Sequence, residues 1–377
     1  MRAYLNGIRL HMRNFLVLYI LIIAVSCLKA QDTKIAPRPQ EPIKPYPYLS
    51  EDVTFQNKEA NITLSGTLTL PKDQSDFPVV VLISGSSPHN RNEEIAGHKP
   101  FLVIADYLTR HGIGVLRYDD RGVGQSEGKY EIAAYADRTS DVESAITYLK
   151  TRKEVNQKKI GLIGHSEGGL IAAMVAEHSK DVNFIILMAA PGLTGYDMVL
   201  LQTEISNKTA GTNDEEIQKE VALLKSIFDV VIKSDNLDEG KFALTESLLN
   251  QLKEYPTQFP EGLKAKDLTQ MVETFTALWF QRILMSNPGA SLRNVECPVL
   301  AINGGKDMQI LPKENLSAIR NALEKSGNEK FLIMELPNLN HLFQEAQTGL
   351  QEEFSTIEQT ISPVALKEIT TWIRTNK

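Results

Sequence analysis

The chain has little of what a metal site or a disulfide framework needs. Its 377 residues include two cysteines, Cys27 and Cys297, and seven histidines, with no His-x-x-x-His or Cys-x-x-Cys spacing. Because structural and catalytic metal sites usually draw on such paired ligands, we expect no metal and no other cofactor. Cys27 lies in the leader-like start of the chain, so a disulfide to Cys297 is implausible, and we expect a domain that is stable without cross-links.

Positive charge is scarce as well. The formal net charge is −7, and four basic residues but no acidic ones fall among the first thirty, so the rest of the chain carries −11. Phosphate binding needs clustered Lys and Arg, which argues against a nucleic-acid partner. The segment Gly122-Val123-Gly124 lacks the setting of a Gly-x-Gly-x-x-Gly or phosphate loop, so no nucleotide site is expected either.

The chain also lacks an apolar run of comfortable membrane-spanning length near its start. Residues 15–25 are apolar, follow Arg13 and precede a short polar stretch. A run this short with these flanks is typical of a signal peptide. We therefore expect an extracytoplasmic protein, periplasmic or secreted, with no stable membrane span in the mature chain.

The processing of this leader has several possible outcomes. Cleavage after Ala30 is one, and lipidation of Cys27 in the lipobox-like Ala24-Val25-Ser26-Cys27 is another. An uncleaved N-terminal anchor is a third. Translation could start at Met1 or at Met12, because Met12-Arg13-Asn14 also makes a compact basic start.

Beyond the leader, the hydrophobic pattern predicts a mostly parallel sheet. Residues 52–70 alternate as an antiparallel hairpin does. Short continuous apolar runs follow, separated by helical patterns, as buried parallel strands require. Strands are expected at 78–84, 114–118, 159–164, 182–188, 298–303 and 330–336, and helices at 100–111, 141–150, 313–325 and 362–375. The repeated alternation predicts one eight-stranded α/β sheet with helices on both faces.

The alternation stops after the sixth strand for about a hundred residues. Helical periodicity replaces it, first over 217–231 behind a cap at Asn213 and again over 271–283. We therefore divide the chain into a signal peptide at 1–30, a Pro-rich tether at 31–48, an α/β core at 49–192 and 297–377, and an inserted helical cap at 193–296.

The strongest chemical signal is Gly164-His165-Ser166-Glu167-Gly168. It joins an apolar strand to a helix that starts with small residues, which is the context of a nucleophile elbow. We therefore predict Ser166 as a nucleophile. A second match, Gly124-Gln125-Ser126-Glu127-Gly128, follows a polar run and has neither strand nor helix beside it, so Ser126 is predicted to be a loop residue.

A serine nucleophile needs a general base. In α/β-hydrolases the chain order is Ser, then Asp or Glu, then His. After Ser166 only His178 and His341 remain, and His178 lies about three turns into the elbow helix, too far to act on Ser166. His341, in the loop after the last strand, is therefore the predicted base.

The acid partner of the base is predicted to be Asp307. It follows the strand at 298–303, at the edge where the base belongs. Glu335 lies inside the last strand and Asp267 inside the helical insertion, so both fit the role less well. A helix-terminal or turn role is the alternative for Asp307.

The charge that develops on a substrate oxygen needs backbone N–H donors. One is expected from Glu167, the residue after the nucleophile, and the second from Ser86 in the loop that follows the strand at 78–84. The Glu167 side chain is expected to compensate the helix N-terminus. His165 is expected to pack under the elbow rather than to take part in catalysis.

Together these segments resemble a known family. They are similar to bacterial α/β-hydrolases grouped with serine aminopeptidase-like esterases. The similar segments are the elbow, the run 118–126, the loop Ser84-Gly85-Ser86-Ser87-Pro88 with its continuation to Glu93, and the region from Trp279-Phe280-Gln281 through Asn303-Gly304-Gly305-Lys306-Asp307. The resemblance covers nearly everything from about residue 50 onward. It implies an α/β-hydrolase fold and an esterase with Ser166, Asp307 and His341 as triad. One departure is that Ser84 and Ser87 stand at the outer positions of the His-Gly-x-Gly found in many relatives.

The sequence therefore predicts a secreted serine carboxylesterase that hydrolyses small acyl esters through an acyl-enzyme. An exopeptidase, a thioesterase or an acyltransferase could use the same triad. An exopeptidase would need a carboxylate to hold the substrate amine, and Asp229, Asp235 and Asp238 are available for that role. A non-catalytic binding protein with a hydrolase fold is a further alternative.

Overall fold

The computed structural model describes residues 37–376 apart from 73, 235 and 255–264. The predicted signal peptide, Cys27, the first part of the tether and Asp235 lie outside these residues. The described chain forms two compact units, one of helices over Gly195–Ser286 and one α/β unit built from the chain on either side of it.

The α/β unit is built on an eight-stranded sheet, as the sequence predicted. The spatial order is β1-β2-β4-β3-β5-β6-β7-β8. β1 and β2 form an antiparallel hairpin and β2 is antiparallel to β4, while the other neighbours are parallel. The strands are β1 (Leu49–Asn57), β2 (Ile62–Leu70), β3 (Val79–Ile83), β4 (Gly114–Tyr118), β5 (Ile160–His165), β6 (Phe184–Met188), β7 (Val299–Gly304) and β8 (Phe331–Leu336).

The central strands are apolar on both sides because both faces of the sheet are covered. In β3, Val79, Val81 and Ile83 belong to one hydrophobic cluster, while Val80 and Leu82 belong to another. Successive side chains of a strand point to opposite faces, so the two clusters are the two faces of the sheet. A continuous apolar run is therefore what this strand requires.

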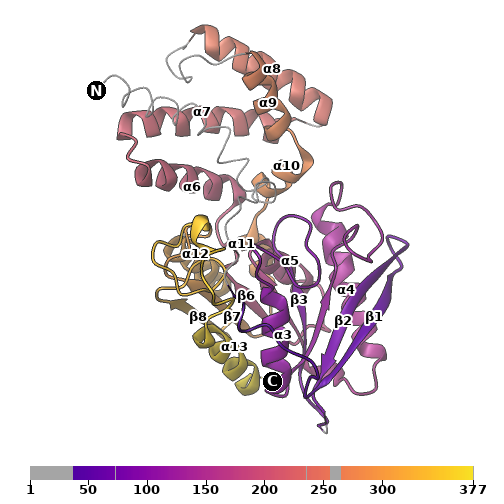
Figure 1. Cartoon of the computed structure of the whole chain (residues 1–377). Helices are drawn as coiled ribbons and strands as arrows, with labels where there is room; N and C mark the ends of the chain where they lie inside the picture. The colour runs from indigo at the N-terminus through magenta and orange to yellow at the C-terminus, as the bar shows by residue number, and fades with distance from the viewer. Residues whose placement is uncertain (1–36, 73, 235, 255–264, 377) are drawn as a thin grey trace. The chain divides into compact units, whose positions relative to one another are not determined.

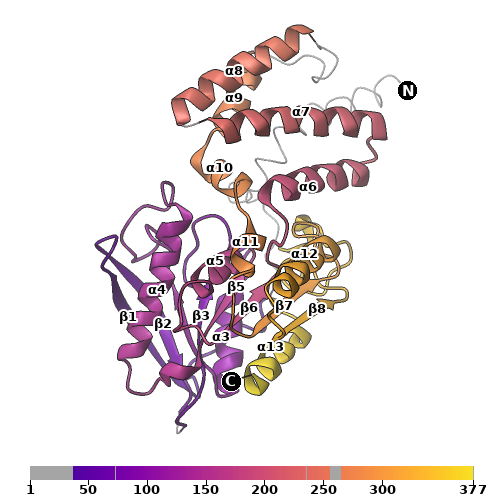
Figure 2. The same cartoon turned by 180° about the vertical axis from the view of Figure 1, so that it is seen from behind.

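Helices pack on the sheet (Figures 1 and 2), and their side chains supply the other half of each cluster. Those that contribute to the first are α4 (Tyr135–Thr151), α5 (Glu167–Ala176), α11 (Pro288–Leu292) and α12 (Pro312–Lys325). Those that contribute to the second are α3 (Pro100–Arg110) and α13 (Pro363–Thr375). The prediction of helices on both faces is confirmed.

One helix is longer than the apolar pattern indicated. α4 begins at Tyr135 rather than near residue 141, and the Asp137 side chain accepts the N–H of Ala134 at 2.8 Å to close its first turn. Its first turns bury Arg138 and Asp141, which are charged. A pattern that counts only apolar residues does not detect a helix whose buried side is polar.

The helical unit is inserted between β6 and β7, as predicted. It contains α6 (Gly195–Thr209), α7 (Asp214–Lys233), α8 (Leu237–Glu254), α9 (Ala265–Phe275) and α10 (Leu278–Leu284), packed around a core of its own. The Asn213 side chain caps α7 by accepting the N–H of Glu216 at 3.0 Å. The apolar run at 271–283 is split, because α9 ends at Phe275. None of the described helices is long and apolar enough to cross a membrane.

The Pro-rich segment that precedes β1 lies against the α/β unit in its described part. The Arg38 guanidinium donates to backbone carbonyls of two distant loops, among them Gly97 at 3.1 Å and Ile357 at 2.9 Å. The amide of Gln40 donates to the carbonyl of Ile361 at 2.7 Å. These bonds fix residues 38–40 beside the loops that lead into α3 and α13.

Candidate active site

Ser166 lies at the sharp turn between β5 and α5. Its φ is 53°, a left-handed conformation that costs a non-glycine residue about 1–3 kcal/mol. The surrounding backbone holds it there, because its N–H donates to Met188 at 2.8 Å and its carbonyl accepts from Gly169 at 2.9 Å. The side chain is half-buried and makes no capping hydrogen bond to α5. The strand, turn and helix predicted for an elbow are therefore present around this serine.

The two outer glycines of the motif allow this turn. A Cβ on Gly164 would collide with the backbone of Gly168, and a Cβ on Gly168 would collide with the carbonyl of Ile83 in β3. Because backbone cannot move aside as a flexible side chain can, only glycine fits at either position. β5, α5 and β3 approach one another closely at this point.

Asp307 and His341 are brought together by the two strands at the other end of the chain. Asp307 follows β7, His341 lies in the loop after β8, and Nδ1 of His341 lies 2.8 Å from Oδ2 of Asp307. Both side chains are buried. The other carboxylate oxygen accepts the N–H groups of Gln309 and Ile310 at 2.8 and 2.9 Å. Asp307 is therefore fixed on both sides, with one oxygen directed at the histidine.

The loop that carries His341 lies against the elbow. The backbone carbonyl of His341 is 3.0 Å from Nε2 of His165, the residue before Ser166, and the two imidazole rings are 4.9 Å apart between centroids. Asn340 shapes this loop, since its side-chain oxygen accepts from Leu342 and Gln344 at 3.0 and 2.9 Å. The structure thus brings the loops of Ser166, Asp307 and His341 to one edge of the sheet.

His178 is not part of this arrangement. Its ring is 74% exposed and lies 2.8 Å from the carboxylate of Glu177, beyond the end of α5. This exposed position at the far end of the helix agrees with the expectation that His178 does not serve Ser166.

The loop after β3 packs directly on the serine. A Cβ on Gly85 would lie 3.4 Å from the Cβ of Ser166. The N–H of Gly85 is already engaged, because it donates to Oε1 of Glu93 at 2.8 Å. Ser86, the next residue, is held in the loop through its carbonyl group, which lies 3.0 Å from Nε2 of His89. The assignment of the Ser86 N–H as an oxyanion donor stays a prediction.

Arg138 connects this loop to the elbow, a role that the sequence did not indicate. One of its nitrogens lies 2.5 Å from the Glu167 carboxylate, and the other donates to the carbonyls of Ser84 and Gly85 at 3.0 and 3.1 Å. The hydroxyl of Tyr135 also donates to Glu167, at 3.0 Å. The Glu167 side chain is therefore a buried ion-pair partner as well as the first residue of α5.

The charge on Arg138 is stabilised by its neighbours. Burial by itself lowers the pKa of this guanidinium, but Tyr130, Glu167 and Asp120 outweigh burial and raise the pKa above its ordinary value. Arg138 is 5% exposed. A buried permanent cation that binds two loop carbonyls holds the predicted oxyanion loop in place.

Glu93 is a second residue that the sequence did not assign. It is 1% exposed, and its Oε1 lies 3.0 Å from Nδ1 of His165. No motif spacing connects it to Ser166, since it depends on how the loop after β3 folds. Among the described residues no group of three or more His, Cys, Asp or Glu side chains is placed to hold a metal ion.

Comparison with known proteins agrees with this architecture. Residues 99–343 match the profile of the serine aminopeptidase S33 family. Esterase EstD of Thermotoga maritima is 27% identical over 292 residues, which cover 77% of this chain and 60% of that esterase. The chain therefore spans less than two thirds of the length of this relative.

Two solved structures share the fold at low identity. A hypothetical protein from Pseudomonas aeruginosa aligns with a TM-score of 0.54 and 17% identity over 93% of this chain and all of that one. An esterase from Pyrococcus furiosus aligns with a TM-score of 0.50 and 16% identity over 92% and 99%. The family profile covers well over half of the chain, so the protein belongs to the serine aminopeptidase S33 family and has the α/β-hydrolase fold.

Proposed function

We propose that this protein is a serine carboxylesterase that cleaves small acyl esters. The observation that carries the proposal is the buried 2.8 Å contact between His341 and Asp307, on a loop that touches the elbow of Ser166. An acid that holds one ring nitrogen leaves the other as a base for a serine hydroxyl. The esterase name of the Thermotoga relative supports an ester as the substrate.

The reaction would run in two halves. His341 takes the proton of Ser166 as the hydroxyl oxygen attacks the ester carbonyl, and the N–H groups of Glu167 and Ser86 stabilise the oxygen that becomes negative. His341 then gives the proton to the departing alcohol, which leaves an acyl-Ser166. Water, deprotonated by the same histidine, attacks this acyl group and releases the acid, and the proton returns to Ser166.

The proposal is tested by labelling and by a substrate panel. A fluorophosphonate should modify the intact protein once, with the label on Ser166 by peptide mass analysis. Short p-nitrophenyl esters should be hydrolysed with an initial burst, which an acyl-enzyme produces. Faster cleavage of aminoacyl p-nitroanilides than of esters would instead favour an exopeptidase, and the absence of both labelling and turnover would favour a binding protein.

Replacing Asp307 by Asn tests whether this carboxylate acts in the triad or has only a structural role. Asn occupies the same space but does not stabilise an imidazolium or hold the same ring tautomer, so kcat should fall by roughly 10⁴-fold. The neighbouring Lys306→Gln variant serves as the control, because the Lys306 side chain contacts the carbonyl of Ala346 rather than the histidine. Equal kcat values for the two variants would refute the assignment of Asp307.

A further inference from the structure

A buried acid and histidine lie next to the proposed triad without belonging to it. Glu93 lies in the loop between β3 and α3, and His165 is the last residue of β5. They are 1% and 5% exposed, and the two ring nitrogens of His165 each lie 3.0 Å from an oxygen, Oε1 of Glu93 on one side and the carbonyl of His341 on the other.

These two contacts determine the protonation of His165. A carbonyl oxygen and a carboxylate oxygen accept hydrogen bonds but donate none. A neutral imidazole has one N–H, so it would place a lone pair against one of the two oxygens. Only the imidazolium, with a proton on each nitrogen, satisfies both contacts when Glu93 is ionised.

The second contact of Glu93 favours its ionised form. The same oxygen that faces His165 also accepts the N–H of Gly85 at 2.8 Å. An oxygen that accepts from two N–H donors is stabilised as a carboxylate. Glu93 therefore holds the loop after β3 with one bond and the histidine with the other.

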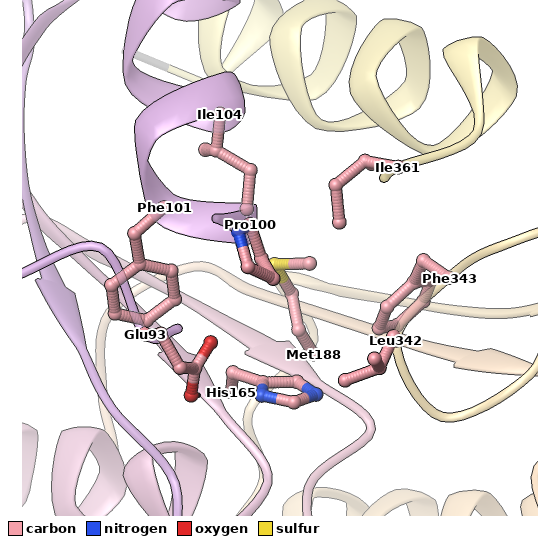
Figure 3. Close-up of a pocket in the computed structure, with 9 residues that line it drawn as sticks. All are labelled: Glu93, Pro100, Phe101, Ile104, His165, Met188, Leu342, Phe343 and Ile361. Carbon is pink, nitrogen blue, oxygen red and sulfur yellow. Dashed lines mark hydrogen bonds and ion pairs between the residues drawn. The ribbon is translucent and has the colours of Figure 1, made fainter. Parts of the chain in front are cut away.

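The surroundings of the pair are apolar. Glu93 and His165 line a small cavity, with room for about one water molecule, whose other walls are apolar side chains, including those of Phe101, Met188 and Phe343 (Figure 3). Oε2 of Glu93 is buried and has no hydrogen-bond partner among the described residues. With little water to screen them, the opposite charges of the two groups attract one another strongly.

The electrostatic balance agrees in direction for both partners. Burial by itself lowers the pKa of His165, but the charge and hydrogen bond of Glu93, the His341 carbonyl and the charge of Asp307 raise it above the ordinary value. Burial by itself raises the pKa of Glu93, but His165, His89 and the N–H of Gly85 lower it below the ordinary value. Both shifts favour the ion pair over two neutral groups.

We propose that Glu93 and His165 form a permanent ion pair that positions the two loops of the active site, the one after β3 and the one carrying His341. The proposal rests on the proposed ester hydrolysis and names two positioning residues for it. The chain of contacts runs from Gly85 through Glu93 and His165 to the backbone of His341. It sets the distance between the oxyanion donors and the base.

A stabilising role alone would not account for this pair. Buried ion pairs are often no more favourable than apolar residues of the same volume, because desolvation offsets their attraction. Leu or Met would fill an apolar cavity of this kind without that cost. What apolar side chains could not do is hold the N–H of Gly85 and the carbonyl of His341 at fixed positions.

The protonation state is tested first on the unchanged protein. In a spectrum of ¹⁵N-labelled histidine rings, one histidine should show two protonated ring nitrogens at pH values above the ordinary pKa of histidine, where an unperturbed imidazole is mostly neutral. Its signal should be absent from the His165→Gln variant, which assigns it. A His165 that has one unprotonated nitrogen at that pH would overturn the proposal.

Kinetics test the positioning role. Glu93→Gln keeps the shape but removes the charge, so kcat for a p-nitrophenyl ester should fall about 10- to 100-fold through misplaced groups, with KM changed little. Glu94→Gln, at the exposed neighbouring position, is the matched control and should keep the wild-type kcat. A wild-type kcat in Glu93→Gln, whether or not KM changes, would contradict the proposal.

A double variant tests whether the two residues act together. If they form one unit, Glu93→Gln with His165→Gln should cost about as much kcat as either single change, because each already breaks the same link. If the fold-losses of kcat in the two single variants multiply in the double variant, Glu93 and His165 do not act as one unit. The ring spectrum of the Ser166→Ala variant tests the ion pair independently of the proposed ester hydrolysis. The imidazolium signal should persist in this variant whether or not the serine proves to be catalytic.

Discussion

The sequence Gly-x-Ser-Glu-Gly occurs twice in this chain, and the structure uses the two copies differently. In the copy at 124–128 the serine is fully engaged, since the Ser126 hydroxyl donates to the carbonyl of Asp119 at 2.6 Å and accepts the N–H of Ser65 at 2.9 Å. In the copy at 164–168 the serine is half-buried at the turn between a strand and a helix. The same five-residue motif therefore forms a buried loop contact in one place and the turn predicted for a nucleophile elbow in the other.

What separates the two copies is the structure beside them. Gly164 is paired with Ile83 of β3 and Leu187 of β6, so the elbow emerges from the middle of the sheet. The other copy follows β4 in a loop, where the N–H of Glu127 donates to the carbonyl of Thr63 at 2.9 Å. A short motif predicts chemistry only together with the strand before it and the helix after it.

The sharpest way to test this contrast is to remove each hydroxyl. Ser166→Ala should lower kcat for short p-nitrophenyl esters by at least about 10³-fold, because the nucleophile is lost, with little change in thermal stability. Ser126→Ala should keep kcat but lose about 1–3 kcal/mol of unfolding free energy, because the buried N–H of Ser65 loses its acceptor. Ester turnover and thermal unfolding of both variants measure this. Loss of activity in Ser126→Ala without destabilisation would overturn the contrast.

Much of the fold and the placement of the candidate residues could be predicted because they depend on local patterns. Apolar runs located the strands, and chain order placed Asp307 and His341 after β7 and β8, where the structure has them. The role of these residues stays a prediction. The fold class is confirmed by the sheet order and by the related solved structures, and the order of elements along the chain places the helical insertion after β6.

The network that holds the site could not be predicted. No motif spacing assigns a role to Glu93 or Arg138, and each reaches the site only because a loop or a helix folds back onto the elbow. A hydrophobic pattern counts such residues as exposed, which is also why the start of α4 was missed. Buried charges are rare enough that a sequence alone favours the exposed alternative.

The glycines of the two copies provide the second test. Gly164→Ala would place a Cβ on the backbone of Gly168, so we expect a loss of at least about 3 kcal/mol or failure to fold. In Gly124→Ala the new Cβ would contact the Asp119 side chain, and the alanine must adopt a φ of 56°. We expect this variant to lose about 1–2 kcal/mol of unfolding free energy. Urea unfolding compares the two. If Gly164→Ala proved the milder variant, the close approach of the backbone at the elbow would not be what requires glycine there.

The two glutamates of the motif provide the third test, which includes the smallest expected effect. Glu167→Gln weakens a buried pair with Arg138 whose side chains are 7% and 5% exposed, and should cost about 1–3 kcal/mol. Glu127→Gln changes an exposed residue whose Oε2 accepts the N–H of Thr63 at 2.6 Å. An amide oxygen accepts that bond equally well, so a change within about 0.5 kcal/mol is expected. Melting temperatures of the two isosteric variants measure the difference. Equal losses would mean that the charge of Glu167 does not matter to Arg138, and that the link between the elbow and the loop after β3 depends on hydrogen-bond geometry alone.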